Sequence, residues 1–377
     1  MFIQRKISES ILKVQPFYQI IVVTGPRQSG KSTLCRHLFP EYSYLNLEDL
    51  SIRARATRDP RAFLKEAGKQ VILDEVQNLP DLLSYIQVMV DEDASLRYVI
   101  TGSSNFALME SISQSLAGRA ALFTLLPLSM TEIENFIVGQ SIDKIMFNGF
   151  YPSIFAKHTP PEIFYSNYNL TYVERDVRQL LEIRNLDRFA HFMSLCALRV
   201  GSELNMSDLA KSVGVSTPTI AEWISILKAS YIVFTLSPFY ANLQKRLTKR
   251  PKLYFYDTGL ATYLMGLSDP SQIKLTGLTG ALFENAAILE LIKRAFNSGK
   301  APRLMFYREN TGKEVDVVDD HGIFVDLYEI KASSTFKQEY TKNMEYVKSL
   351  LGDRIRESIV IYDGESQPPS ILNIRDI

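Results

Sequence analysis

The sequence predicts an α/β protein whose first part is a parallel β-sheet with helices on both faces. Three observations support this fold class. An apolar run at residues 20–23 leads through a glycine-rich turn into a helix-compatible stretch at 32–38. Further strand candidates follow at 42–47, 70–74, 96–102 and 122–128, with a helical segment at 59–66 among them. Strands that alternate with helices are typical of parallel sheets.

The glycine-rich turn has the pattern G-x-x-x-x-G-K-S, which functions between a strand and a helix. Its glycines let successive backbone N–H groups turn toward phosphate oxygens, and the helix N-terminus adds partial positive charge. Lys31 is expected to contact the β- and γ-phosphates, and the Ser32 hydroxyl to bind Mg²⁺. The predicted nucleotide-binding residues are Gly25, Pro26, Arg27, Gln28, Ser29, Gly30, Lys31, Ser32 and Thr33.

Two carboxylates follow the apolar strand that begins at residue 70. Asp74 is expected to bind Mg²⁺ through water or to bridge to Ser32, and Glu75 to polarise the water that attacks the γ-phosphate. Taken alone, an apolar strand followed by Asp-Glu is often an ordinary strand end. Its place after the phosphate loop favours the second half of a hydrolysis site.

Two later positions add candidates to this site. The strand at 96–102 ends in the polar run 103–105, whose side chains can reach the γ-phosphate or the attacking water. A plain Gly-Ser turn is the alternative. Arg119 is a candidate for the cation that stabilises the transition state, in cis or against a neighbouring subunit. It fits equally well a surface arginine at a helix end.

Five segments in this order resemble one family: GPRQSGKST, LNLEDL, VILDEVQNLP, ITGSSN and SLAGRAALFTLLPLS. They are similar to the AAA-related P-loop ATPases of bacteria and archaea that carry a C-terminal domain of unknown function. The resemblance implies a P-loop NTPase fold, an ATP site and nucleotide chemistry at Lys31, Ser32, Asp74 and Glu75. It also implies that Asn105 is the sensor residue and that Arg119 is the arginine of the Ala-Gly-Arg element.

Composition limits the remaining classes of protein. The chain has 377 residues, which is enough for two or three domains, and its net charge is zero. Any contact with nucleic acid must therefore come from a local basic patch. Cys35 and Cys196 define no disulfide framework, which suits a reducing cytoplasm. The sequence shows no signal-peptide core and no membrane-spanning run, so we expect a cytoplasmic protein.

Residues 142–199 have a helical, aromatic-rich pattern that resembles the helical lid after an AAA-type core. Tyr165, Tyr168 and Tyr172 fall at three- and four-residue spacing, which favours a half-buried packing face over a base-stacking platform.

Residues 205–256 predict a winged helix-turn-helix. Helix candidates at 205–213 and 217–227 flank a short glycine turn, and strands at 231–236 and 252–256 would form the wing. The loop between these strands holds Lys252 and the candidate DNA contacts Lys245, Arg246, Lys249 and Arg250. Wing residues of this kind bind DNA phosphates. The second helix offers few donors for base readout, and winged helices also serve as protein interaction modules.

The last part of the chain predicts an α/β domain. A helix presents Glu284 near its start, one strand carries Asp316, and the next carries Glu329 and Lys331 on one face. This set resembles the PD-(D/E)xK nuclease core, in which two carboxylates bind Mg²⁺ and the lysine lowers the pKa of the attacking water. Non-cleaving scaffolds share the pattern, so nuclease activity and a structural or DNA-docking role both stay open.

The predicted organisation is an ATPase core at 1–140, a helical lid or linker at 141–200, a winged helix at 201–265 and a nuclease-like domain at 266–377. Three functions fit it. The chain is an ATPase, with ATP and Mg²⁺ as cofactors, coupled to DNA engagement by its C-terminal half. Alternatively, it is an ATP-gated, Mg²⁺-dependent DNA nuclease, or an NTP switch that binds protein partners through the winged helix.

Overall fold

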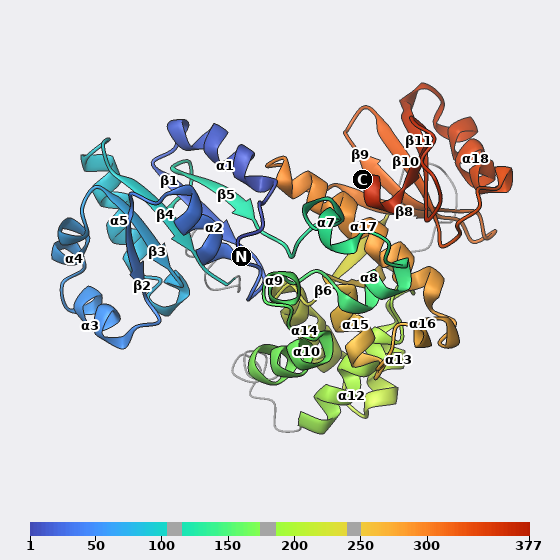
Figure 1. The fold of residues 1–377 in the computed structure, drawn as a ribbon, viewed down its shortest axis with the longest axis horizontal. Helices are drawn as coiled ribbons and strands as arrows, with labels where there is room; N and C mark the ends of the chain where they lie inside the picture. The colour runs from blue at the N-terminus through green and yellow to red at the C-terminus, as the bar shows by residue number, and fades with distance from the viewer. Residues whose placement is uncertain (104–114, 174–185, 240–249) are drawn as a thin grey trace. The chain divides into compact units, whose positions relative to one another are not determined.

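The computed structural model describes residues 1–103, 115–173, 186–239 and 250–377 (Figure 1). The chain divides into two compact units. The N-terminal unit comprises Met1–Leu128 together with the short segments Ala229–Tyr231 and Phe296–Lys300. The C-terminal unit comprises the remaining residues. Each unit has its own β-sheet.

The N-terminal unit is built on a five-stranded parallel sheet with the strand order β2-β3-β4-β1-β5. This confirms the predicted sheet. The strands are β1 (Ile20–Thr24), β2 (Ser43–Asn46), β3 (Gln70–Asp74), β4 (Arg97–Thr101) and β5 (Ala120–Thr124). One strand was placed wrongly by the sequence: β5 begins before residue 122 and ends at Thr124 instead of reaching 128. Pro127 lacks the N–H that a continuing ladder would need.

Helices cover both faces of this sheet, as predicted. On one face, the alternate residues Ile21 and Val23 of β1 pack with α1 (Ile7–Val14) and α2 (Lys31–Leu38). On the other face, Ile20 and Val22 join a cluster with α3 (Leu50–Arg58), α4 (Pro60–Ala67) and α5 (Leu82–Glu92). All five residues of β1 are therefore buried, which explains why its sequence is apolar without interruption.

The C-terminal unit begins with helices and ends with a mixed sheet. Its first helices are α7 (Glu134–Ile137), α8 (Ile142–Asn148), α9 (Pro152–Ala156), α10 (Pro161–Tyr168) and α12 (Leu186–Ala197). They are followed by α13 (Met206–Val213), α14 (Thr217–Ala229), α15 (Thr258–Leu264), α16 (Gln272–Leu275), α17 (Thr279–Asn297) and α18 (Lys342–Leu351). Gly214 has a φ of 74° and ends α13 just before α14, so the two helices and the glycine turn lie where the sequence predicts them.

One seven-stranded sheet, in the order β12-β11-β10-β9-β8-β6-β7, runs through this unit. Its strands are β6 (Val233–Pro238), β7 (Lys252–Phe255), β8 (Leu304–Arg308), β9 (Glu314–Asp320), β10 (Val325–Lys331), β11 (Ile355–Tyr362) and β12 (Ile371–Asn373). β6 pairs with β7 in antiparallel fashion and with β8 in parallel. The two strands expected to form a wing are thus part of the same sheet as the strands that follow them.

The tyrosine stripe lies in the core of the C-terminal unit. Tyr165 and Tyr168 are each 1% exposed, which confirms the packing interpretation for these two residues. The Tyr165 hydroxyl donates to Asp257 Oδ1 at 2.6 Å, and the Tyr168 hydroxyl accepts from Tyr151 at 2.8 Å. Asp257 also accepts from the Phe150 backbone N–H at 2.8 Å. The buried hydroxyl and carboxylate groups are hydrogen-bonded to one another, as buried polar groups must be.

Both cysteines are free and buried, Cys35 on α2 and Cys196 on α12. Among the residues described, none of the helices combines the length and the apolar character needed to cross a bilayer.

Candidate nucleotide-binding site

The phosphate loop, residues 25–30, connects β1 to α2 and depends on its glycines. Gly30 has a φ of 95° at the start of α2, and Gly25 has a φ of 139°. A Cβ on Gly25 would lie 2.2 Å from the Leu125 carbonyl oxygen, so only glycine fits there. The chain after β5 therefore packs directly against the outside of the loop.

Lys31 begins α2 and is buried beside the loop. Its ammonium group donates to the carbonyl oxygens of Gly25 at 3.1 Å and Pro26 at 2.8 Å. Burial lowers the pKa of Lys31 to about 8, and the negative charges of Glu75 and Asp74 oppose this shift. The ammonium is thus held next to the loop's main chain, where a phosphate could take over its hydrogen bonds.

Asp74, at the end of β3, accepts hydrogen bonds from three hydroxyl groups. Ser32 on α2 donates to Asp74 Oδ1 at 2.9 Å, and Thr101 at the end of β4 donates to the same oxygen. Tyr44 on β2 donates to Asp74 Oδ2. The structure therefore brings together Ser32 and Asp74, the two residues that the sequence predicts as Mg²⁺ ligands.

Tyr44 and Thr101 belong to the site but were not predicted from the sequence. Their strands β2 and β4 lie on either side of β3, and this neighbourhood exists only in the folded sheet. Burial, followed by the hydrogen bond to Asp74, raises the pKa of Tyr44 above its usual value. Tyr44 consequently remains a neutral donor to the carboxylate at physiological pH.

Glu75 follows Asp74 in a left-handed conformation, with a φ of 56°. A non-glycine residue in this region costs about 1–3 kcal/mol, and such residues cluster at functional sites. Its carboxylate accepts from the Gln77 side-chain amide and from the Ser103 hydroxyl at 3.5 Å. Ser103 is thus the polar residue after β4 that reaches this carboxylate, whereas Asn105 lies outside the described residues.

Arg119 lies at the opposite end of the strands from the phosphate loop. The parallel register pairs Ile20 with Ala120, so Arg119 precedes the first residue of β5, whereas the loop follows Thr24 at the other end of β1. Five residues of strand span about 16 Å. The guanidinium forms two hydrogen bonds to Asp91, at 2.7 and 2.8 Å. Arg119 therefore does not reach the loop of its own chain.

The donor set at Asp74 suits Mg²⁺. The Ser32 hydroxyl and the Asp74 carboxylate supply hard oxygen atoms side by side, 2.9 Å apart. Within the described part of the chain, no group of three or more His, Cys, Asp and Glu residues is arranged to hold a metal ion. Mg²⁺ usually needs no such group, because water and substrate phosphates complete its octahedral shell.

The second predicted site also comes together, within the C-terminal unit. Glu284 on α17, Asp316 on β9 and Glu329 on β10 lie within reach of one another's charges: burial, and after it the charge of Asp316, raises the pKa values of both glutamates. The Lys331 ammonium lies 2.6 Å from Glu329 and 3.5 Å from Asp316. Burial is the largest cause of the shift at Glu329, whose pKa is about 8.

Lys252 corrects one sequence interpretation. It was counted among the basic residues of the wing loop, at the start of the second strand; it does begin β7, but it is buried, with only 4% of its surface exposed. Its ammonium lies 2.9 Å from Glu284 Oε1 and 2.6 Å from Glu314 Oε1, and the Tyr254 hydroxyl also donates to Glu284. Arg250 is exposed, and the other candidate DNA contacts, Lys245, Arg246 and Lys249, lie outside the described residues.

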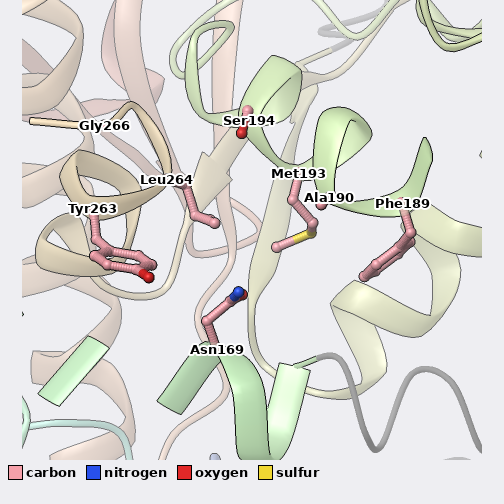
Figure 2. A pocket seen from close by; sticks show the side chains of 8 residues that line it. All are labelled: Asn169, Phe189, Ala190, Met193, Ser194, Tyr263, Leu264 and Gly266. Carbon is pink, nitrogen blue, oxygen red and sulfur yellow. The ribbon is translucent and has the colours of Figure 1, made fainter. Parts of the chain in front are cut away.

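A cavity of about 340 Å³ lies within the C-terminal unit. Figure 2 shows the side chains of Asn169, Met193 and Tyr263 pointing toward the same space between α12 and α15. The other lining residues are Phe189, Ala190, Ser194, Leu264 and Gly266. None of the residues predicted from the sequence to carry chemistry lines this cavity.

Comparison with protein families divides the chain into three regions. Residues 18–134 match a family described as an AAA domain. Residues 139–271 and 279–376 match two families described as domains of unknown function, DUF8612 and DUF4143. Over its first region, the chain resembles an AAA domain. This similarity confirms the predicted resemblance in its coarse form, an AAA-related P-loop protein with a C-terminal domain of unknown function.

Similar proteins occur in bacteria and archaea. An uncharacterized protein of Mycobacterium tuberculosis is 28% identical over 365 residues, covering 93% of this chain and 78% of the relative. An uncharacterized protein of Methanocaldococcus jannaschii is 24% identical over 385 residues, covering 92% of this chain and 83% of the relative. Among solved structures, a Walker-type ATPase of Pyrococcus abyssi has a TM-score of 0.46 at 13% identity, covering 70% of this chain and 96% of that chain.

Proposed function

We propose that this chain is a Mg²⁺-dependent ATPase. The observation that carries the proposal is the arrangement around Asp74, which places the Ser32 hydroxyl, the Asp74 carboxylate and Glu75 beside a phosphate loop. The choice of ATP rests on the similarity of residues 18–134 to an AAA domain. No described residue is assigned to recognition of the base.

The proposed roles follow from the geometry. The loop N–H groups and Lys31 bind the phosphates, and Lys31 exchanges its carbonyl partners for phosphate oxygens. Ser32 and Asp74 would hold Mg²⁺, which would neutralise part of the phosphate charge. Glu75 orients the attacking water and accepts its proton. Ser103 and Gln77 hold the Glu75 carboxylate in place.

ATP binding and turnover should be measured on the wild type and on Lys31→Ala, Asp74→Asn and Glu75→Gln. Lys31→Ala should lose binding, whereas Glu75→Gln should bind ATP and lose about 10²–10⁴-fold in turnover, the usual worth of a general base. Glu92→Gln is the matched control, because Glu92 forms an exposed ion pair with Arg61. Undiminished turnover in Lys31→Ala would show that the proposed site is wrong.

A role for Arg119 in hydrolysis requires a second copy of the chain, because Arg119 and its own phosphate loop lie at opposite ends of the neighbouring strands β5 and β1. If Arg119 acts on the phosphate loop of a second copy, the wild-type turnover per chain should rise with protein concentration as the copies associate. Arg119→Ala should then reduce turnover, and it should remove this rise. A concentration series of the wild type and of Arg119→Ala tests this role. A loss in Arg119→Ala that does not depend on concentration would contradict it.

We further propose that ATP turnover is coupled to DNA engagement by the C-terminal unit. The support is the helix pair α13 and α14 joined at Gly214, together with the exposed Arg250 beyond β6. Lys252 takes no part, since it is buried. Turnover should change when DNA is added at low salt and return to its basal rate at high salt. An unchanged rate would favour the protein-partner alternative.

The nuclease alternative is less favoured because Lys252, which is not part of the nuclease pattern, already partners the acidic cluster of Glu284, Glu314, Asp316 and Glu329. Lys252 bridges two of these residues, and Lys331 lies against the other two. A divalent cation would have to compete with the Lys252 ammonium, whereas Lys331 lies where the nuclease pattern expects its lysine. Incubation of supercoiled DNA with Mg²⁺ or Mn²⁺ tests the activity. Nicking by the wild type that disappears in Glu329→Gln and in Lys331→Ala would restore this alternative.

A further inference from the structure

A buried arginine near the start of the chain contacts the main chain of the phosphate loop. Arg5 precedes α1 and is 5% exposed. Its Nη1 donates to the Ser29 carbonyl oxygen at 2.9 Å, and its Nη2 donates to the Leu126 carbonyl oxygen at 2.7 Å. We infer that Arg5 is a positioning residue that holds the phosphate loop in its binding conformation, an inference that rests on the proposed ATP site.

The geometry of the peptide unit explains how Arg5 would act. A trans peptide is planar, and its carbonyl and N–H groups point in opposite directions. Arg5 fixes the direction of the Ser29 carbonyl, so the N–H of Gly30 in the same peptide unit points away from Arg5. This N–H is one of the donors that a phosphate would need. Arg5 thus acts through the loop without touching the nucleotide.

The same guanidinium joins the loop to the chain that supports it. Leu125 donates its N–H to the Thr24 carbonyl at 2.8 Å, and its carbonyl oxygen lies against Gly25. Leu126, the next residue, accepts the second hydrogen bond of Arg5. The planar fork of arginine can reach both carbonyls at once, which a lysine ammonium on its single stem does less well.

Arg5 and Lys31 contact different carbonyl groups of the loop. Lys31 donates to Gly25 and Pro26, and those two hydrogen bonds must break when its ammonium moves to a phosphate. The hydrogen bond from Arg5 to Ser29 does not depend on that movement. Arg5 can therefore hold the loop both before and after the nucleotide binds.

The alternative is that Arg5 only anchors α1. That helix already has apolar anchors, since Ile7 and Ile11 are fully buried against residues of α2 and β1. Burying a guanidinium is costly unless its hydrogen bonds are satisfied, and an apolar side chain would anchor the helix at lower cost. The placement of a charge against the loop carbonyl favours the positioning role.

The test compares Arg5→Met and Arg5→Lys with Ile11→Ala. ATP affinity, KM and kcat are measured at a temperature at which each variant is folded, as verified by its thermal unfolding curve. Arg5→Met should raise KM and the dissociation constant for ATP by about tenfold or more, the range for a hydrogen bond to a charged group. Because the loop binds ground state and transition state alike, kcat should stay near the wild-type value. The KM and the dissociation constant of Arg5→Lys should lie between those of the wild type and those of Arg5→Met.

Ile11→Ala controls for loosening of α1, because it removes core packing while leaving Arg5 in place. It should lower the melting temperature without changing KM. The inference is overturned if folded Arg5→Met or Arg5→Lys keeps the wild-type KM, or if Ile11→Ala raises KM as much. Failure of the proposed function looks different, because the wild type would then bind no ATP or Lys31→Ala would turn over ATP normally.

Discussion

Replacing Gly25 with alanine should disrupt the phosphate loop through a clash that can be separated from backbone strain. The new Cβ would lie 2.2 Å from the Leu125 carbonyl oxygen, and contacts of this kind are not tolerated under 3.0 Å. The gap must therefore widen by about 0.8 Å. Either the loop or the chain after β5 has to move.

The cost can be built from the contacts that would be lost. The φ of 139° at Gly25 costs an alanine about 1–3 kcal/mol. Displacing Leu125 would also weaken its 2.8 Å hydrogen bond to Thr24, worth about 1 kcal/mol. Gly68→Ala is the matched control in the same unit, because Gly68 has a φ of 96° but nothing within 4 Å of an added Cβ.

Thermal unfolding with and without ATP is the assay. Both variants should melt below the wild type, Gly25→Ala by about 2–4 °C more than Gly68→Ala, in line with an extra 1 kcal/mol. Saturating ATP should raise the melting temperature of Gly68→Ala as it does for the wild type, and much less for Gly25→Ala. Equal melting temperatures and equal ATP shifts in the two variants would refute this reasoning.

Three further predictions concern ionisable groups. Affinity for ATP should fall as pH rises from 7 to 9, because free Lys31 loses its proton at a pKa of about 8; Lys31→Arg should lack this fall. Tyr44→Phe removes a donor to Asp74 and should raise the Mg²⁺ concentration for half-maximal turnover several-fold, whereas Tyr42→Phe should not. Glu329 keeps its proton to a pKa of about 8 in the folded state, whereas an unfolded glutamate loses it near 4.3, so the free energy of unfolding should fall between pH 5 and 8. Denaturant titrations should show a flatter pH dependence for Glu329→Gln.

The sequence predicted the phosphate loop well because the signal is local. A strand, a glycine turn and a helix follow one another within residues 20–38, and Asp74 marks the end of a strand by its own apolar pattern. Ser32 and Asp74 meet because their elements adjoin at the same edge of the sheet. In a parallel sheet the carboxyl ends of the strands lie at the same edge, so the proximity of Ser32 and Asp74 could be inferred without coordinates.

Other site residues could not be found in this way. Arg5, Tyr44 and Thr101 act through contacts with distant segments, and nothing in their local sequence distinguishes them from ordinary surface or strand residues. The exposure of Lys252 was predicted wrongly because a run of basic residues gives no indication of which of them is buried in the fold. Its ammonium is buried only because two glutamates from α17 and β9 surround it.

The pairing of β6 with β8 has a consequence for how the chain can be divided. Two separate sequence families meet between residues 271 and 279, yet β6 pairs with β8 across that boundary, with Ser237 in register with Met305 and the Phe239 N–H donating to the Phe306 carbonyl at 2.7 Å. Cutting the chain there would turn β6 and β8 into open strand edges, which promote aggregation. We therefore expect residues 139–271 and 279–376 to be inherited together and to melt in a single calorimetric transition.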